Sequence, residues 1–212
     1  MYLTSRQRGF SIVEIAVALA VLGIGLAFAM PSYTKWIANA QIRNRAESIS
    51  FGLQQARAEA IKRGGLVEFL LTTSSPTAAS EDTAVASSTG QNWIVRAIVD
   101  AAVAPTDYAY VSGQFGTEGA GNAIVAAFNN SLGTALDTVT FDALGRIARG
   151  GNDNGTATIE KICVGSTSLT VANGARILEI DIGTAGQIKM CDPSVVDATD
   201  PRRCVSPAPR CS

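Results

Sequence analysis

The first part of the chain has an almost uniformly apolar pattern. From Phe10 to Met30 it runs for 21 residues with a single ionisable side chain, Glu14. About 20 apolar residues, at a rise of 1.5 Å per residue, span the hydrocarbon core of a bilayer. We therefore predict a transmembrane helix over residues 10–31.

Glu14 is unusual in such a segment. Insertion of a carboxylate at the centre of a bilayer costs about 2.5–3.5 kcal/mol, so the residue needs a partner or a role. A secretory signal peptide and a plain signal anchor are the alternatives for this segment. A signal peptide would end in a small-residue cleavage site, and none follows Met30. A plain signal anchor would not require a carboxylate in its apolar segment.

Residues 32–65 keep the helical period but become amphipathic. Apolar residues separated by three or four positions form one stripe, which consists of Ile42, Ala46, Ile49, Leu53, Ala56 and Ala60. Most of the charged residues fall off this stripe. Gly64 and Gly65 end the pattern, directly after two cationic residues that suit a helix C-terminus. We predict one long helix from about Phe10 to Arg63, whose second half packs under a sheet.

The rest of the chain, residues 66–212, is predicted to form a β-rich head. Short segments rich in strand-forming residues are separated by turn-prone residues. The predicted strands are Val67–Leu71, Trp93–Val99, Ala123–Phe128, Thr138–Phe141, Ile159–Val164, Ala175–Ile182 and Gln187–Cys191. Residues 72–92 and 113–122 are expected to be loops. A long helix followed by antiparallel strands predicts an α+β fold.

Composition narrows the functional classes. The chain has 17 basic and 18 acidic residues and no histidine, so neither an overall nucleic-acid footprint nor the commonest general base is present. No nucleophile motif or phosphate-binding glycine loop occurs, and we expect no enzyme activity, catalytic residue or cofactor. The four cysteines lie in the last third, without a C-x-x-C pair, which favours disulfides in an oxidising compartment over a metal site.

The residues Arg8-Gly9-Phe10-Ser11-Ile12-Val13-Glu14 resemble the processing site of type IV prepilins and type II secretion pseudopilins. The resemblance implies the pilin fold and a leader peptide, residues 1–9, that prepilin peptidase/methyltransferase removes after Gly9. Phe10 would then carry a methylated amine, and Glu14 would pair with the amine of a neighbouring subunit in the filament core. Pro31 would kink the helix. The partners implied are other pilin subunits, with the inner membrane holding the protein before assembly and the head in the periplasm.

Within that superfamily, five segments resemble the FimT/GspH group of minor pilins and pseudopilins. They are residues 43–47, 53–60, 93–95, 139–146 and 186–193. The resemblance implies a structural subunit that initiates, caps or adapts a type IV pilus. A type II secretion pseudopilin remains an alternative, because the head does not separate the two.

DNA is a further alternative partner, since some members of this group resemble DNA receptors with a basic stretch on the last strands. Here the matching stretch, Gly186–Lys189, has Gln and Lys in place of two arginines. The candidate DNA contacts are Lys189, Arg202 and Arg203, with three aspartates among them.

The four cysteines, Cys163, Cys191, Cys204 and Cys211, allow three pairings. The segment between Cys191 and Cys204 resembles the disulfide-closed C-terminal region of pilins. The resemblance therefore favours Cys191 with Cys204, which leaves Cys163 with Cys211.

Overall fold

The computed structural model describes residues 10–99, 107–129, 135–148 and 158–204, without the side chains of residues 27–29 and 31. Its contacts divide the chain into two units, residues 1–37 and residues 38–212. One helix, α1 (Ile12–Arg63), contributes to both units. The predicted leader, Gly9 included, and Cys211 lie outside the described residues.

The helix α1 ends where the sequence predicts. Gly65 N donates to Ala60 O, and Gly64 adopts a positive φ of 64°, which glycine accepts without strain. Lys62 and Arg63 lie in the last turn and both pair with Glu59. These charges complement the negative end of the helix dipole.

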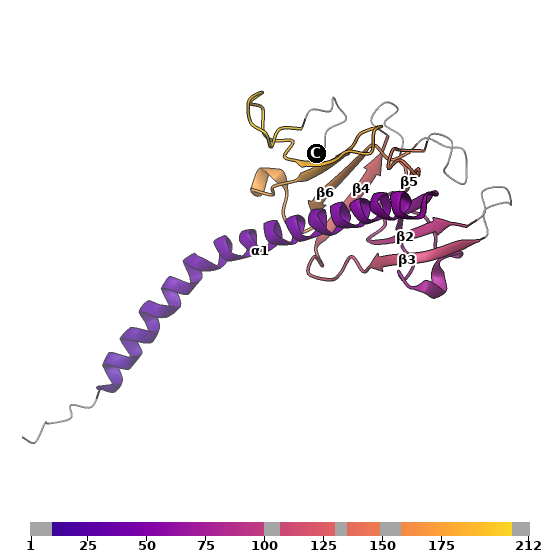
Figure 1. Ribbon diagram of the computed structural model, residues 1–212. Coiled ribbons are helices and arrows are strands. Elements are labelled where there is room, and N and C mark those ends of the chain that lie inside the picture. Colours follow the sequence, from indigo (N-terminus) through magenta and orange to yellow (C-terminus); the bar gives the residue numbers. More distant parts are fainter. Residues whose placement is uncertain (1–9, 100–106, 130–134, 149–157, 205–212) are drawn as a thin grey trace, which may run out of the picture. The chain divides into compact units, whose positions relative to one another are not determined.

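The eight described strands form two antiparallel four-stranded sheets (Figure 1). Sheet A has the order β3-β2-β1-β5, with β1 (Val67–Thr72), β2 (Asn92–Ile98), β3 (Tyr108–Gln114) and β5 (Thr138–Phe141). Sheet B has the order β4-β6-β7-β8, with β4 (Ala123–Phe128), β6 (Lys161–Ser166), β7 (Leu178–Ile182) and β8 (Ile188–Cys191). Two short 3-10 helices, η1 (Ala78–Ser80) and η2 (Val171–Asn173), lie in connections.

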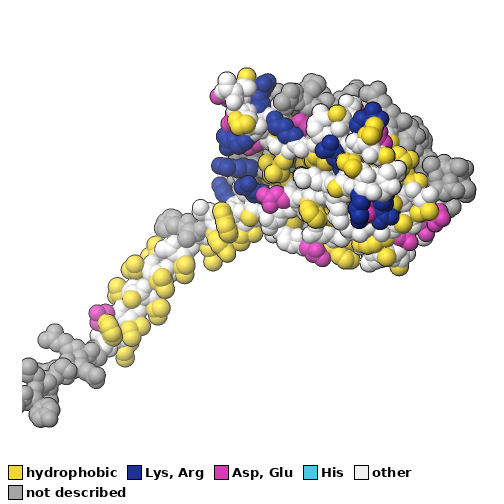
Figure 2. Space-filling model, in the orientation of Figure 1, with side chains coloured by type: hydrophobic (Ala, Val, Ile, Leu, Met, Phe, Trp, Pro, Cys, Tyr) yellow, Lys and Arg dark blue, Asp and Glu magenta, His cyan; other side chains and the backbone are white. Residues whose placement is uncertain are grey.

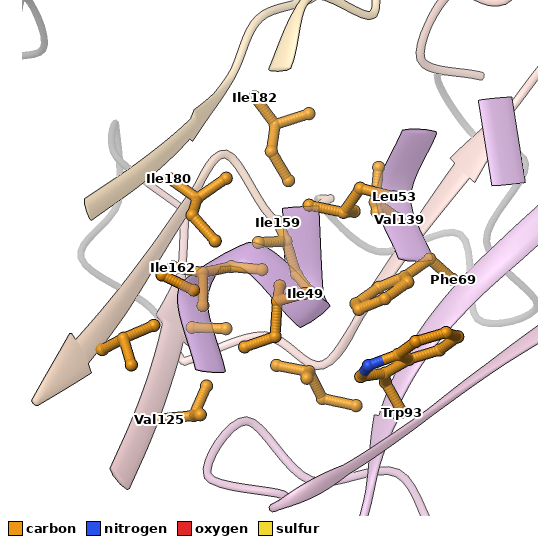
Figure 3. Packing of buried hydrophobic residues seen from close by; sticks show 14 of the residues in the cluster. Ile49, Leu53, Phe69, Trp93, Val125, Val139, Ile159, Ile162, Ile180 and Ile182 are labelled. Carbon is orange, nitrogen blue, oxygen red and sulfur yellow. The ribbon is translucent and has the colours of Figure 1, made fainter. Parts of the chain in front are cut away.

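The apolar stripe of α1 contacts both sheets and forms the core of the second unit. All six residues of the predicted stripe are fully buried. Figure 3 shows Ile49 and Leu53 between Phe69 and Trp93 of sheet A and the isoleucines of sheet B. Gly52 faces the stacked rings of Phe69 and Trp93, and a Cβ at this position would lie only 2.9 Å from Phe69. The α+β prediction, with a long helix packed against antiparallel strands, is confirmed.

The outer face of sheet A is buried as well. Leu70 and Ile94 point away from the helix core and are at most 1% exposed. The loop of residues 73–91 lies over them and is bound to the sheet, because Thr72 Oγ1 donates to Val85 O (2.7 Å) and Ser87 N donates to Leu71 O (2.9 Å). We call residues 73–91 the sheet A cover. It is a loop, as predicted, but it is hydrogen-bonded to the sheet along its inner side instead of being fully exposed.

The edge strands of both sheets are bonded to other parts of the chain. Two carboxylates of the sheet A cover accept hydrogen bonds from the edge strand β3. Tyr108 N donates to Asp82, and Tyr110 N donates to Glu81. Further backbone bonds on the edges of β5, β4 and the end of β8 are Ala148 N to Thr140 O, Ile159 N to Thr138 O, Ala127 N to Ser88 O and Asp192 N to Arg202 O. Unpaired edges are a hazard for association, and these contacts reduce it.

The strand predictions differ from the structure mainly in one place. Strand β3 is missing from the prediction, and Gly113 and Gln114, which were expected to begin a loop, belong to it. The other strands are present, with ends shifted by up to three residues. Instead of one sheet, the head contains two.

Candidate functional site

The N-terminal end of α1 contains the residues for which the sequence predicts processing and assembly. Ser11 caps the helix, because its Oγ accepts a hydrogen bond from Val13 N (3.3 Å) and its carbonyl accepts one from Ile15 N (3.2 Å). Glu14 lies in the first turn, where the helix dipole favours a carboxylate. Phe10, directly before the cap, is 78% exposed. The end of the helix therefore presents Phe10 and Glu14 together, without burying either.

The helix surface after Glu14 is apolar and exposed. Every described residue from Phe10 to Leu26 is exposed, including the large side chains of Ile15, Val17, Leu19, Val21, Leu22, Ile24 and Leu26. Figure 2 shows these hydrophobic side chains along the segment. Within the part of the helix that is described, no segment is both long and apolar enough to cross a membrane. The transmembrane assignment of residues 10–31 stays a prediction.

Pro31 lies inside α1, which continues through it. The loss of one backbone N–H at a proline is tolerated in such a position only with local adjustment of the helix. The kink assigned to Pro31 stays a prediction.

The second group of candidate residues lies on the outer face of sheet B, where two rows of side chains cross three strands. In one row Lys161, Asp181 and Lys189 are direct neighbours on β6, β7 and β8. In the next row Cys163, Glu179 and Cys191 are neighbours in the same way. Charged and cysteine side chains therefore alternate on a face that a simple strand pattern would assign to solvent.

The ion pair at the centre of this face is buried. Lys161 and Glu179 are 0% and 1% exposed, and Lys161 Nζ lies 2.8 Å from Glu179 Oε1. Asp181 lies beside this pair. Its pKa is raised to about 6 by burial, and further by the charge of Glu179 and a hydrogen bond with it, while Lys161 and Lys189 act in the opposite direction. Because Lys161 pairs with Glu179, Asp181 ionises less readily than the row of lysines would suggest.

The C-terminal loop, residues 192–204, is attached to this face by a disulfide. Cys191 and Cys204 are bonded, which is the pairing that the resemblance favoured. Cys163 is also disulfide-bonded, and its expected partner, Cys211, is outside the described residues. The loop also continues the sheet, since Asp192 forms a parallel bridge with Arg203.

The three candidate DNA-binding residues are brought near one another on this loop and β8. Lys189 Nζ donates to Arg203 O (3.2 Å), and Arg202 pairs with Asp200 at 2.7 Å. That pairing lowers the pKa of Asp200 to about 2. Figure 2 shows Lys and Arg side chains gathered at this edge of the second unit. Two of these three cationic side chains, Lys189 and Arg202, therefore already have partners within the chain.

The same region brings together three groups that resemble metal ligands. Ligand atoms of Glu179, Cys191 and Cys204 lie within 4.8 Å of one another. The two sulfurs are joined in a disulfide, and a metal site needs them as free thiolates. Lys161, 2.8 Å from Glu179, adds a positive charge that opposes a cation. The cluster does not fit a metal centre.

Three of the five segments that carry the FimT/GspH resemblance meet at one junction. Arg57 of α1 donates through Nε to Gly145 O (3.0 Å), in the turn after β5. Gly186, in the turn before β8, packs on the same carbonyl, so that a Cβ there would lie 1.9 Å from Gly145 O. Both glycines have positive φ, 71° and 77°. These motif residues therefore fix the end of the helix to both sheets.

Comparison with known proteins agrees with the N-terminal geometry. Residues 4–30 match the prokaryotic N-terminal methylation motif. The type IV major fimbrial protein FimA of Dichelobacter nodosus is similar to the chain, with 35% identity over 60 residues. The N-terminal segment of the chain is therefore that of a type IV pilin. For this segment the predicted resemblance to type IV pilins is confirmed.

The pilin similarity is limited to part of each protein. The FimA alignment covers 28% of this chain and 37% of FimA, and another FimA sequence of the same organism is 39% identical over 62 residues, with the same coverage. The type IV minor pilin FimU of Pseudomonas aeruginosa has a TM-score of 0.43 and 17% identity, covering 70% of this chain and 87% of FimU. A second crystal form of FimU gives a TM-score of 0.39. Values this low carry no inference about function.

Several structural residues were not predicted from the sequence. One is the helix cap Ser11, although Ser11 and Glu14 have the S-x-x-E spacing of a helix start. Arg45, Ser48 and Gln55 flank the apolar stripe and bond to the loop and strands of sheet A, for example Ser48 to Gln114 at 2.6 Å. The position of these polar residues beside the apolar stripe indicates that they lie near the sheet. Their partners are too distant in the sequence to be identified from that position.

Proposed function

We propose that this chain is a minor pilin, a structural subunit that prepilin peptidase cuts after Gly9 and that is then inserted into a type IV pilus. In this proposal Phe10 becomes the methylated N-terminal residue. The inner membrane holds the subunit before assembly, with its head in the periplasm. The methylation motif over residues 4–30 supports the processing step.

One observation carries the assembly role, namely the contrast between the two halves of α1. In the first half the apolar side chains are exposed, and from Ala38 onward the apolar stripe is buried by the strands of its own chain. Large exposed apolar surfaces are rare on soluble monomers and mark surfaces that bind other molecules. Lipid would cover the first half before assembly, and the same segments of neighbouring subunits would cover it in the filament.

Glu14 supplies the register in this proposal. It lies near the start of the apolar segment, and the capped helix end keeps it exposed. The attraction between a carboxylate and an amine is far stronger in an apolar surrounding than in water. A neighbouring subunit's N-terminal amine would therefore be drawn to Glu14, which fixes the stagger between the two helices.

The minor-pilin assignment, and with it the FimT/GspH group, is supported by the junction of Arg57, Gly145 and Gly186. Three of the five sequence segments of that group meet there and join the end of α1 to both sheets. A type II secretion pseudopilin would share the junction and the helix. DNA binding through Lys189, Arg202 and Arg203 is less well supported, because Asp200 already occupies Arg202.

The test is the substitution Glu14→Gln in the native host, followed by shearing of surface filaments and mass spectrometry of the mature N-terminus. We expect cleavage before Phe10 to continue and the variant to be at least about tenfold depleted from filaments, which corresponds to a loss of 1.4 kcal/mol. Glu47→Gln is the matched control, since Glu47 is an exposed acid on the same helix.

Normal amounts of the Glu14 variant in filaments would contradict the proposed pairing. A mature terminus other than Phe10 would contradict the processing site. If loss of the protein leaves pili intact but retains secreted proteins in the periplasm, the pseudopilin alternative is correct.

A further inference from the structure

Two exposed aromatic residues lie on α1 directly after the apolar segment. Tyr33 and Trp36 are 62% and 67% exposed, and their rings stack with centroids 6.1 Å apart and planes inclined by 25°. A spacing of three residues places them on one side of the helix. Lys35, between them in sequence, is exposed too.

Each of these side chains has an apolar body and a polar end. The phenol of tyrosine and the indole N–H of tryptophan form hydrogen bonds while their rings remain in an apolar surrounding, and both residues are enriched where membranes meet water. A lysine can extend its charged end toward lipid headgroups from the same depth. The combination differs from the preceding segment, where Met30 and Leu26 are purely apolar.

The distances along the helix agree with that location. The 21 residues from Phe10 to Met30 give about 30 Å of helix, which is the thickness of the hydrocarbon core. Tyr33 and Trp36 follow three and six residues later, about 5–9 Å farther along. The interfacial layer of a bilayer is about 5–8 Å thick on each side.

We propose that Tyr33 and Trp36, with Lys35, form an anchor that binds the lipid headgroup layer while the subunit resides in the membrane. This inference rests on the membrane stage of the proposed function. The anchor would fix the depth of the helix, because moving it inward would bury the polar ends and moving it outward would expose Met30. Phe10 would consequently be held at the opposite surface.

The two tryptophans of the chain allow a direct test. Trp93 is 2% exposed in the core of the head, so its fluorescence should not respond to lipid. The full chain would be reconstituted at low density into phosphatidylcholine–phosphatidylglycerol vesicles that contain quenching lipids, labelled either near the headgroup or near the end of the acyl chain. Trp36→Phe provides the matched control, since its remaining emission comes from Trp93 alone and also reports whether the head is folded.

We expect the emission of Trp36, taken as the difference between the two proteins, to be quenched several-fold more by the shallow label than by the deep one. Trp93 should respond to neither. Equal or stronger quenching by the deep label would overturn the anchor, as would no quenching in protein that floats with the vesicles; in the second case Trp36 would be free for packing against another subunit. Protein that does not float with vesicles would instead refute the membrane stage of the proposed function.

Discussion

Both sheets of the head bury an ion pair on the face turned away from α1, but they cover that face by different means. In sheet A, Arg96 Nη2 lies 2.7 Å from Glu68 Oε1, with both side chains at most 8% exposed. In sheet B the corresponding pair is Lys161 and Glu179. Sheet A is covered by residues 73–91 through hydrogen bonds, whereas the C-terminal loop over sheet B is fixed by a disulfide.

The surroundings of the two pairs differ as well. Arg96 has further partners, because its guanidinium lies 3.4 Å over the ring centre of Tyr108 and its Nη1 donates to Glu81 O. The pair in sheet B has a second acid, Asp181, as a neighbour, and Lys189 lies on the other side of that acid. Four experiments would separate these contributions.

The largest effect is expected from Lys161→Met, which leaves the carboxyl groups of Glu179 and Asp181 together on a buried face. Removing one partner of a buried pair costs about 3–5 kcal/mol of the free energy of unfolding. Chemical denaturation followed by Trp93 fluorescence would measure it. Lys189→Met is the matched control, because Lys189 lies on the other side of Asp181 and is exposed, so that a loss below about 1 kcal/mol is expected.

In sheet A, Glu68→Gln should cost less, about 1–2 kcal/mol, because Arg96 keeps its contacts with Tyr108 and Glu81. The same denaturation experiment applies. If Glu68→Gln lowers the free energy of unfolding as much as Lys161→Met does, the contacts of Arg96 with Tyr108 and Glu81 do not compensate for the lost partner.

Replacing Cys191 and Cys204 together by serine should destabilise the head by about 3 kcal/mol, as expected for a loop of this length. Hydrogen exchange of residues 192–203 and of β8 should become faster, while residues 73–91 serve as the internal control and remain unchanged. Faster exchange in both covers would mean that the two sheets are coupled rather than independent.

The fourth experiment measures a dependence of stability on pH. The pKa of Asp181 is raised from 3.8 to about 6. Between these two pH values the folded protein therefore keeps a proton on Asp181 that the unfolded chain has lost. Stability from this proton is complete below about pH 4 and disappears as the pH rises through about 6. Unfolding midpoints between pH 4 and 7 should therefore fall with rising pH, and Asp181→Asn should flatten this part of the profile. An unchanged slope in the variant would assign the dependence to other groups.

Local patterns were sufficient for the elements that they govern. The stripe from Ile42 to Ala60 predicts the buried side of α1, and Gly64-Gly65 predicts its end, because both depend on neighbouring residues alone. Strand β3 was missed for a physical reason. Gly113 was interpreted as part of a glycine-rich loop, but a Cβ there would lie 2.8 Å from Pro76 and 2.9 Å from Trp93 O. A close approach of two chain segments, rather than a turn, requires this glycine.

Of the candidate site, the sequence predicted the N-terminal residues and the Cys191–Cys204 disulfide. Gly9, Phe10 and Glu14 follow from a contiguous motif. The buried rows on sheet B did not, since Glu179 alternates with isoleucines like a solvent-exposed residue and is nevertheless 1% exposed. Cys204, one of the groups close to Glu179, is 25 residues away in sequence, and a local sequence pattern cannot predict a contact over that separation.

The bonded edges of the two sheets have a consequence for crowding. Bare strand edges let crowded domains join edge to edge into a continuous, irreversible aggregate. Here Glu81 and Asp82 already occupy donors of β3, and Ser88 occupies one of β4. These described edges are therefore poor sites for association, and the exposed apolar side chains of α1 remain as the surface for it.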